Sequence, residues 1–368
     1  MNNKLTLSFI AGIVISAIAL YLAFRNVPFT ELIHYFANLN YTWVATSIII
    51  VVLCFFVRAW RWRIILESSR KISLIRAYHP MIIGFMMNCV LPGRIGELAR
   101  PAILKKRENV AYATGLATVA AERVFDICFL VVFLVITFSA VKINPDLKMR
   151  FGSYELSRGT LEAILGGMVE LGFFLIAGIV LISINTIQQL VTRLLLKIPD
   201  LFFFTGSRFR ATLADKFCRP LAGFVENIAR GFHLIRYPKK LLACFGLSFL
   251  VWGLHALSYY IVSLGSPGIN LTFMEICAYM VILMFIIALP SVPGFWGLWE
   301  AGGIFALSLF GVATRDAAGY TLANHAVQVF PVIIMGFLSA MIISVNILQL
   351  SRNSKTYETE EAHRKPEN

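Results

Sequence analysis

Charged side chains are scarce in this sequence, and their scarcity excludes an ordinary soluble domain. Asp, Glu, Lys and Arg make up 14% of the 368 residues, and 58% of the residues are hydrophobic. Soluble domains carry about 25% charged and about 45–50% apolar residues. The apolar residues gather in several long runs, and about 20 such residues suffice to cross a bilayer. We therefore expect an all-α integral membrane protein, a polytopic helix bundle.

Paired cysteines and enzyme signatures are also missing. The six cysteines stand singly, without a CxxC pair, which argues against a disulfide framework and a metal site. His255 and His325 are interpreted as hydrogen-bonded helix-packing residues. HExxH, GxSxG, Walker A and dinucleotide-binding motifs do not occur. We predict a protein that is not an enzyme, holds no metal or other cofactor and hydrolyses no ATP, so any transport would be passive or ion-coupled.

Acidic residues are fewer than basic ones, and the net charge is +13. In a membrane protein this excess is typical of basic loops that stay in the cytoplasm beside anionic lipid, and it does not indicate nucleic-acid binding. We therefore place both termini and the most basic stretches in the cytoplasm, with 58–79 as a loop and 351–368 as a disordered tail. The basic stretches are residues 58–79, 105–107 and 185–240, and four more Lys and Arg residues lie in the tail.

Six apolar segments are predicted to cross the membrane within a single domain, residues 1–350. Residues 141–160 are predicted to form an outer loop. Residues 185–240, with ten basic and three acidic side chains, form the largest cytoplasmic loop; we expect amphipathic helices along the membrane there and a possible docking surface for a partner enzyme. The predicted crossings are residues 5–24, 43–57, 111–140, 161–184, 241–264 and 318–350.

Two further apolar segments are interrupted by helix-breaking residues. Residues 80–91 are too short to cross at about 1.5 Å per residue, and the basic residues at 105–107 indicate a return to the cytoplasm. The second segment, residues 273–289, breaks before a short apolar run at 304–312. Both are predicted to be re-entrant hairpins; the alternative for each is one kinked span. The break residues are Pro92, Gly93, Gly96, Pro293, Gly294 and Gly297.

The two breaks share the pattern P-G-x-x-G followed by a glutamate, Glu97 in the first and Glu300 in the second. One hairpin enters from the inside and the other from the outside, which is typical of an inverted-topology repeat. We expect repeat one at about residues 5–140 and repeat two at about residues 161–350. In such folds the substrate site lies near the middle of the bilayer, where the broken helices meet.

Helix breaks at membrane depth leave free backbone N–H groups that can hold an anion, and irregular backbone there must be buried in protein or line a cavity. Arg94 and Arg100 add guanidinium groups suited to phosphate, so a phosphate-bearing lipid headgroup is the expected guest. The alternative is a Pro/Gly loop at the membrane surface with its charges in water. The predicted substrate-binding residues are Asn88, Arg94, Glu97, Arg100, Glu122, Arg123, Asp126 and Glu300.

A second group of charges, Glu122, Arg123 and Asp126, lies beside an apolar run. Glu122 and Asp126 stand at i and i+4 and share one face of a helix. Charges at this depth are usually functional or paired. We expect Arg123 and Asp126 to exchange partners with Arg94 or Glu97 in a charge network; a static brace for the hairpin is the alternative.

Taken together, these motifs resemble a known family. "NCVLPGRIGELARP", "AERVFD" and "VPGFWGLWEAGG" are similar to the flippase-like family built on the transmembrane region of lysylphosphatidylglycerol synthase, over roughly residues 5–350. The resemblance implies a multi-pass protein of the bacterial inner membrane associated with lipid translocation. Some members carry a soluble aminoacyl-transferase or glycosyltransferase domain. This sequence shows neither, so a stand-alone member is expected and the synthase activity is not carried over.

The sequence thus favours a flippase-like transporter that moves an anionic phospholipid, or a polyprenyl or glycolipid phosphate, between leaflets. The alternative is a non-transporting membrane subunit that presents lipid to, or regulates, a partner enzyme of envelope biosynthesis. A third hypothesis is an intramembrane transferase that uses Glu97, Glu122 or Asp126 as a base, but no residue supplies a nucleophile or a metal site.

Overall fold

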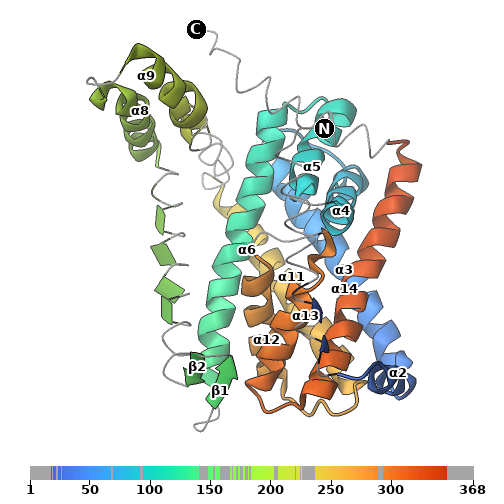
Figure 1. Ribbon diagram of the computed structural model, residues 1–368. Helices are drawn as coiled ribbons and strands as arrows, with labels where there is room; N and C mark the ends of the chain where they lie inside the picture. Colours follow the sequence, from blue (N-terminus) through green and yellow to red (C-terminus); the bar gives the residue numbers. More distant parts are fainter. Residues whose placement is uncertain are drawn as a thin grey trace.

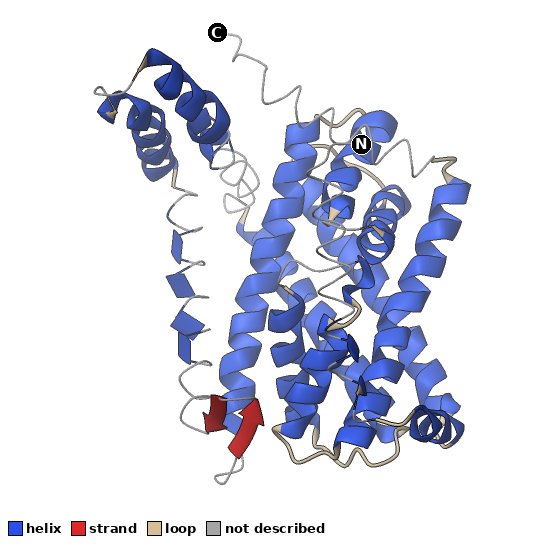
Figure 2. Ribbon diagram, viewed as in Figure 1, coloured by secondary structure: helices blue, strands red, loops and turns tan. Residues whose placement is uncertain are grey.

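Long helices lie side by side in the computed structural model, with one short pair of strands at an end of the bundle (Figure 1, Figure 2). This arrangement confirms the all-α membrane bundle expected from the composition. The structure describes residues 18, 20–21, 24–25, 27–67, 69–91, 94–140, 148–151, 154–157, 166–167, 169–170, 173–174, 177–178, 181, 184–202, 206–219, 221–223, 225, 237–288 and 293–345.

The helices and strands follow one another in a simple order along the chain. The first half contains α2 (Phe29–Ala37), α3 (Tyr41–Leu66), α4 (Leu74–Val90), α5 (Ile95–Glu108), α6 (Tyr112–Ala140), β1 (Lys148–Phe151) and β2 (Tyr154–Ser157). The second half contains α8 (Asn185–Leu201), α9 (Ser207–Leu213), the π-helical turn η1 (Ala214–Cys218), α11 (Pro238–Leu264), α12 (Phe273–Ile287), the 3₁₀ turn η3 (Pro293–Phe295), α13 (Leu298–Ser308) and α14 (Thr314–Ile342).

Three helices among the described residues are long and apolar enough to cross a membrane. They are α3, α11 and α14, with 26, 27 and 29 residues, and at about 1.5 Å per residue each exceeds a hydrocarbon core of about 30 Å. α6 is a single helix of 29 residues over the crossing predicted at 111–140. The crossings predicted at 5–24 and 161–184 lie largely outside the described residues.

Two helix pairs fold back on themselves and enter the bundle from opposite ends (Figure 1). α4 and α5 pack against each other and form hairpin one; α12 and α13, joined through η3, form hairpin two. The four helices contain 17, 14, 15 and 11 residues, fewer than the roughly 20 needed to cross. The two segments are therefore hairpins and not kinked spans.

The hairpins meet inside the bundle, because η3 of hairpin two contacts α4 of hairpin one. The expected inverted arrangement of the two hairpins is thus present, while the repeat boundaries at 5–140 and 161–350 stay predictions. Hairpin one begins and returns at an end that we call the basic end, and α2 lies at the opposite end (Figure 1). The basic end carries Arg70, Lys71, Lys105, Lys106 and Arg107.

Residues 58–79 do not form the predicted loop. α3 continues to Leu66 and α4 begins at Leu74, so only a short connection separates the two helices. Arg58 and Arg61 are 5% and 0% exposed and lie inside the bundle. The prediction was wrong because every basic residue of this stretch was assigned to water, whereas these two guanidinium groups are paired within the protein.

Small residues let the helices approach one another closely. Gly336 of α14 lies against α4, where a Cβ would stand 2.2 Å from Cβ of Met86 and 3.1 Å from the carbonyl oxygen of Ile82. The hydroxyl of Ser47 on α3 donates to the carbonyl oxygen of Ser258 on α11 at 2.9 Å. Lipid tails provide no hydrophobic force between helices, so such contacts and interhelical hydrogen bonds stabilise the bundle.

The segments outside the bundle follow the predictions in part. The outer loop predicted at 141–160 contains an antiparallel hairpin in which Lys148 pairs with Ser157 and Phe151 with Tyr154. Within residues 185–240 the structure describes the helices α8, α9 and η1, in agreement with the helices predicted there. Their position along a membrane stays a prediction, and the tail at 351–368 lies outside the described residues.

The packing of hairpin one predicts a strong effect of Gly96→Ala. A Cβ at Gly96 would stand 1.8 Å from the carbonyl oxygen of Gly84 and 2.6 Å from Oδ1 of Asn88, so α4 and α5 must move apart. Overpacking costs about 1–3 kcal/mol or more, and we expect a melting temperature several degrees lower for purified protein in detergent. The control is Gly246→Ala on α11, where nothing lies within 4 Å; an equal loss in both variants would contradict the close approach.

Candidate functional site

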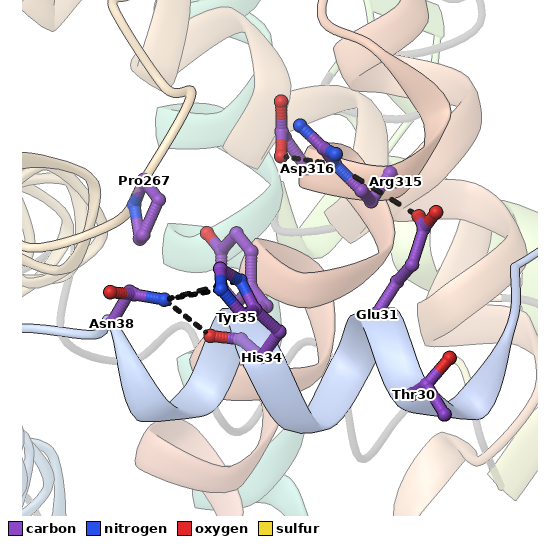
Figure 3. A pocket seen from close by; sticks show the side chains of 8 residues that line it. All are labelled: Thr30, Glu31, His34, Tyr35, Asn38, Pro267, Arg315 and Asp316. Carbon is purple, nitrogen blue, oxygen red and sulfur yellow. Dashed lines mark hydrogen bonds and ion pairs between the residues drawn. The ribbon is translucent and has the colours of Figure 1, made fainter.

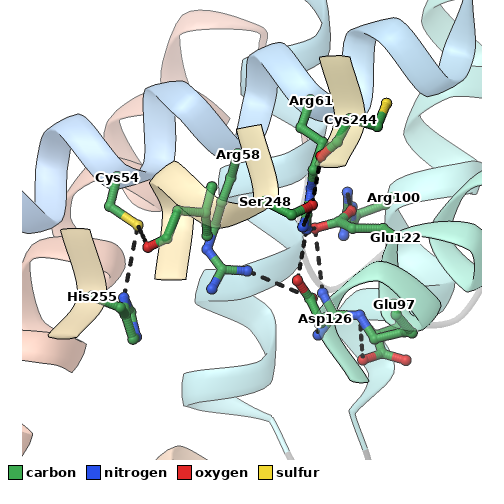
Figure 4. A network of polar contacts seen from close by, with 12 residues as sticks. Cys54, Arg58, Arg61, Glu97, Arg100, Glu122, Asp126, Cys244, Ser248 and His255 are labelled. Atoms are coloured by element: carbon green, nitrogen blue, oxygen red, sulfur yellow. Dashed lines mark hydrogen bonds and ion pairs between the residues drawn. The ribbon is translucent and has the colours of Figure 1, made fainter. Parts of the chain in front are cut away.

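Seven charged side chains from three helices meet inside the bundle. Figure 4 shows their contacts from close by. We call these side chains the arginine–carboxylate network. Two of them come from α3, two from α5 and three from α6, so hairpin one and two long helices build the network together. Its members are Arg58, Arg61, Glu97, Arg100, Glu122, Arg123 and Asp126.

Glu122 is the most enclosed member, with 0% of its surface exposed. Its Oε2 accepts a hydrogen bond from Nη2 of Arg100 at 2.5 Å, and its Oε1 accepts one from Nη2 of Arg61 at 3.3 Å and one from Nη2 of Arg123 at 3.4 Å. Charge-assisted hydrogen bonds of this kind compensate the cost of burying an ionised carboxylate. Glu122 therefore ties α3 and α5 to α6.

Asp126 lies one helical turn further along α6 and binds a second set of guanidinium groups. Its Oδ1 accepts a hydrogen bond from Nη2 of Arg61 at 2.8 Å. Its Oδ2 lies 3.4 Å from Nη1 of Arg123 and 3.8 Å from Nη1 of Arg58. Nη1 of Arg61 also donates to the hydroxyl of Ser248 on α11 at 2.8 Å. Arg61 thus connects α3 with both α6 and α11.

Aromatic rings make cation–π contacts with the guanidinium groups of the network. The ring centroid of Phe85 on α4 lies 5.6 Å from Cζ of Arg58, 5.6 Å from Cζ of Arg100 and 5.7 Å from Cζ of Arg123. Arg100 also lies 4.1 Å from the ring centroid of Trp62. Cation–π attraction strengthens when the groups are removed from water, so these rings help to hold three of the four arginines close together.

The network carries more positive than negative groups. Four arginines face three carboxylates, and when all are ionised one positive charge is left. The side chains of Arg123 and Glu97 are 31% and 28% exposed and lie 4.0 Å apart, so they form the open side of the network. Among the contacts of the described residues, no Nε atom of the four arginines has a hydrogen-bond partner. The cluster therefore retains donors for a further anion.

The structure places the two hairpin residues that were predicted to exchange partners with Arg123 and Asp126 in different surroundings. Glu97 lies 4.0 Å from Arg123, whereas no contact among the described residues joins Arg94 to the network. Arg94 adopts a left-handed conformation with φ 54°, and its Nη2 donates to the carbonyl oxygens of Ile287 and Ala288 at 3.1 and 3.2 Å. These are the free carbonyls at the end of α12. Arg94 thus fastens the start of α5 to the break of hairpin two.

The remaining predicted residues are structural parts of the two breaks. The amide of Asn88 accepts a hydrogen bond from the backbone N–H of Gly96 at 2.8 Å, which closes hairpin one. In hairpin two, Gly294 and Gly297 have φ values of 66° and 88°, a region that glycine adopts without strain. Pro293 begins the turn η3. Pro92 and Gly93 lie outside the described residues.

Glu300 belongs to a different group of contacts. It is 0% exposed, and it binds His325 on α14 and the backbone N–H of Gly297. Among the described residues, no contact joins it to the arginine–carboxylate network. The structure thus divides the predicted site into two parts: the arginine–carboxylate network, to which hairpin one contributes, and a carboxylate–histidine pair between hairpin two and α14.

Sequence reasoning missed Arg58, Arg61, Phe85 and Ser248. A signal for the first two was available: they stand at i and i+3, and so share one helix face, directly after an apolar run. Ser248 carried no signal, because a serine in an apolar run is common in membrane helices. Within the described part of the chain, no group of three or more His, Cys, Asp or Glu side chains is placed to hold a metal ion.

A pocket of about 690 Å³ opens at the opposite end of the bundle (Figure 3). Arg315 in this pocket lies 3.2 Å from Asp316 and 4.0 Å from Glu31, so carboxylates balance its charge. It therefore offers no positive surplus comparable to that of the network. Its lining residues are Thr30, Glu31, His34, Tyr35, Asn38, Pro267, Arg315 and Asp316.

The sequence that forms the two hairpins and the network matches a known protein family. A family described as the lysylphosphatidylglycerol synthase TM region matches residues 9–336, which is most of the chain. The chain belongs to this family. The resemblance seen in the motifs of both hairpins is thereby confirmed, and the protein is a multi-pass membrane protein of the lysylphosphatidylglycerol synthase TM-region family.

Individual relatives of the family are distant. Glycosyltransferase AglD of Haloferax volcanii is 23% identical over 92% of this chain and 55% of its own length, so the chain spans about half of that relative. UPF0104 membrane proteins of Pyrococcus horikoshii and Methanocaldococcus jannaschii are each 23% identical, over 78% and 73% of this chain and 84% and 99% of their own lengths. No solved structure matches the chain.

The enclosed position of Glu122 predicts that Glu122→Ala destabilises the protein. The substitution leaves the buried Arg61 and Arg100 without their shared carboxylate, and breaking a buried ion pair costs about 3–5 kcal/mol. We expect the free energy of unfolding in detergent to fall by that amount. The control is Asp215→Ala, because the pair of Asp215 and Arg219 is exposed on both sides and surface pairs contribute little. Equal effects of the two substitutions would contradict the central role of Glu122.

Proposed function

We propose that this protein moves an anionic, phosphate-bearing lipid between the leaflets of the membrane without ATP hydrolysis, and that the arginine–carboxylate network binds the lipid phosphate. The observation that carries this proposal is the surplus of guanidinium groups in the network. A phosphate brings the negative charge and the acceptor oxygens that the four arginines do not receive in full from Glu97, Glu122 and Asp126.

Arg123 is the member through which a phosphate would enter. It is the most exposed of the four arginines, with 31% of its side chain accessible, against 6% for Arg58, 0% for Arg61 and 2% for Arg100. Its contacts to Glu97 and Asp126 are long, at 4.0 and 3.4 Å. A phosphate offers bidentate acceptors that match a guanidinium fork. It can therefore replace these carboxylates at Arg123 while Glu122 keeps the deeper arginines paired.

In the proposed transport, the headgroup crosses the bilayer where the two hairpins meet. Hairpin one presents Glu97 and Arg100 from a helix that begins inside the bundle, and hairpin two reaches the same region from the opposite end. Broken helices that meet from both sides are typical of transporters with alternating access. Charges inside a membrane domain that face the bundle interior mark substrate or ion pathways.

An apolar groove offers a place for the acyl chain of the lipid. It has a volume of about 420 Å³ and lies between α3 and α14. Val44, Ile48, Val327 and Ile334 are among the side chains that line it. α3 therefore carries groove residues in its first half and the buried Arg58 and Arg61 in its second half. The first half would contact the acyl chain of an amphipathic lipid and the second half its phosphate.

One relative favours a second candidate function. The chain matches about half of a protein named as a glycosyltransferase, so a related membrane region occurs together with such an enzyme in one chain. The second candidate is a membrane subunit that presents lipid phosphate to a partner enzyme through residues 185–240. Leu190 and Leu194 of α8 are exposed and would belong to the docking surface.

Lipid exchange in liposomes tests the first candidate. Wild-type protein should carry a headgroup-labelled anionic phospholipid between leaflets faster than empty liposomes, and Arg123→Gln should reduce the rate at least about tenfold, the equivalent of about 1.4 kcal/mol. The matched control is Arg76→Gln. Arg76 is an exposed arginine near the basic end that pairs with Glu108. The Arg76→Gln substitution therefore removes the same charge outside the network, and this variant should retain lipid exchange.

Two results would count against the transporter. Equal rates for wild type and Arg123→Gln would show that the network does not bind the phosphate. No exchange by folded wild-type protein with any anionic lipid would favour the second candidate. In that case, deletion of residues 185–225 should abolish a function in cells that Arg123→Gln leaves intact.

A further inference from the structure

Glu300 of hairpin two and His325 of α14 form a buried pair that the proposed transport does not use. Nδ1 of His325 lies 2.5 Å from Oε1 of Glu300, and Nε2 lies 2.7 Å from the carbonyl oxygen of Gly294. Oε2 of Glu300 accepts the backbone N–H of Gly297 at 2.7 Å. Both side chains are 0% exposed. The pair therefore joins α13, α14 and the break of hairpin two.

These contacts fix the number of protons in the pair. A carbonyl oxygen only accepts hydrogen bonds, so Nε2 of His325 carries a proton. The contact between Nδ1 and Oε1 then needs one more proton, either on the imidazole or on the carboxyl group. In both cases the pair holds one proton beyond the state of a neutral histidine beside an ionised carboxylate, and its total charge is zero.

We propose that Glu300 and His325 form a proton-binding site and that its occupancy couples lipid transport to a proton gradient. The proposal rests on the proposed transport and names its coupling ion. Ionisable pairs within a membrane domain are typical of proton relays in transporters. The site lies at the break of a re-entrant hairpin, where a change of local contacts can move a whole helix.

Loss of the proton breaks the bridge between α13 and α14. When the proton leaves to water, the charge of the pair changes from zero to −1. A lone pair of Nδ1 then faces an ionised carboxylate across 2.5 Å, and the contact becomes repulsive. The buried negative charge is costly in apolar surroundings. Hairpin two therefore has a closed state with the proton and a state without it in which Glu300 must separate from His325 and reach water.

Aromatic rings pack against the imidazole of His325. The imidazole of His325 lies between two indoles, stacked on Trp299 with ring centroids 4.5 Å apart and tilted against Trp296 at 4.4 Å. Indole faces attract cations. The other titratable groups that face this region are the phenols of Tyr259, Tyr279 and Tyr320 on α11, α12 and α14, which are uncharged near neutral pH. The cationic group at the same break is Arg94.

The break also links the pair to the network. Gly294, which accepts the hydrogen bond of His325, lies against the carbonyl oxygen of Cys89 at the end of α4. Arg94 binds the end of α12 and begins α5, the helix that carries Glu97 and Arg100. A movement of hairpin two on proton release therefore acts directly on hairpin one and on the contact of Glu97 with Arg123.

Tryptophan fluorescence tests the proton site without any transport. A protonated imidazole quenches an indole stacked on it, so wild-type protein in lipid nanodiscs should show a fluorescence transition with pH. We expect His325→Gln and Glu300→Gln to remove this transition. Glu300→Gln is nearly isosteric: its carboxamide oxygen can accept the N–H of Gly297 and its amino group can donate to a neutral His325, so the bridge remains without the extra proton.

The matched control is His255→Gln on α11. His255 also lies beside an indole, with its ring centroid 5.9 Å from that of Trp252, but among the described contacts it pairs with no carboxylate. The His255→Gln variant should retain the fluorescence transition that His325→Gln removes. A transition that persists in both His325→Gln and Glu300→Gln would overturn the proposal, and so would a wild-type signal that does not change with pH while the protein stays folded.

A pH gradient across liposomes tests the coupling. Wild-type exchange of labelled anionic lipid should become several-fold faster under a proton gradient of the favourable direction, whereas Glu300→Gln should exchange at one rate with and without it. Wild-type exchange that ignores the gradient would refute coupling while leaving the lipid function in place. If wild type exchanges no lipid at all, the transport proposal fails, and the fluorescence transition alone decides whether the pair binds a proton.

Discussion

Burial of ionised side chains among α3, α5, α6 and α11 is the constraint on which the rest of the structure depends. A lone charge in hydrocarbon is strongly unfavourable, so each arginine of the network lies within 4 Å of a carboxylate. These ion pairs fix the helices relative to one another. Arg61 alone contacts Glu122, Asp126 and Ser248. The ion pairs thus provide the specificity that apolar packing between lipid-like surfaces does not.

The hairpins depend on this constraint and on a second one, the satisfaction of backbone groups at their breaks. In water the ends of α12 and α5 would be solvated, but inside the bundle each free carbonyl or N–H needs a partner in the protein. Arg94 supplies it for α12, Asn88 for α5, and Glu300 for α13. Residues that the sequence analysis predicted to bind substrate thus also satisfy the backbone groups at the two helix breaks and stabilise both hairpins inside the bundle.

Much of the fold was accessible from the sequence, because it rests on length and periodicity. The apolar runs at 241–264 and 318–350 and the P-G-x-x-G breaks predicted two spans and both hairpins correctly. The site was accessible only in part. Glu122, Arg123 and Asp126 stand close together in the chain and were found. Arg58 and Arg61 were assigned to a loop, because a count of basic residues cannot tell a solvated guanidinium from one paired with a carboxylate sixty residues later. The bond of His325 to Glu300 had no sequence signal, since their helices meet only in the folded bundle.

The position of Arg58 and Arg61 on α3 also sets a condition for the assembly of the protein during synthesis. Their partners Glu122 and Asp126 lie on α6 and Ser248 on α11, so α3 leaves the ribosome well before the groups that neutralise it. The buried ion pairs of Arg58 and Arg61 can therefore form only after α6 has been synthesised. In this chain the order of translation determines the order in which charge becomes buried.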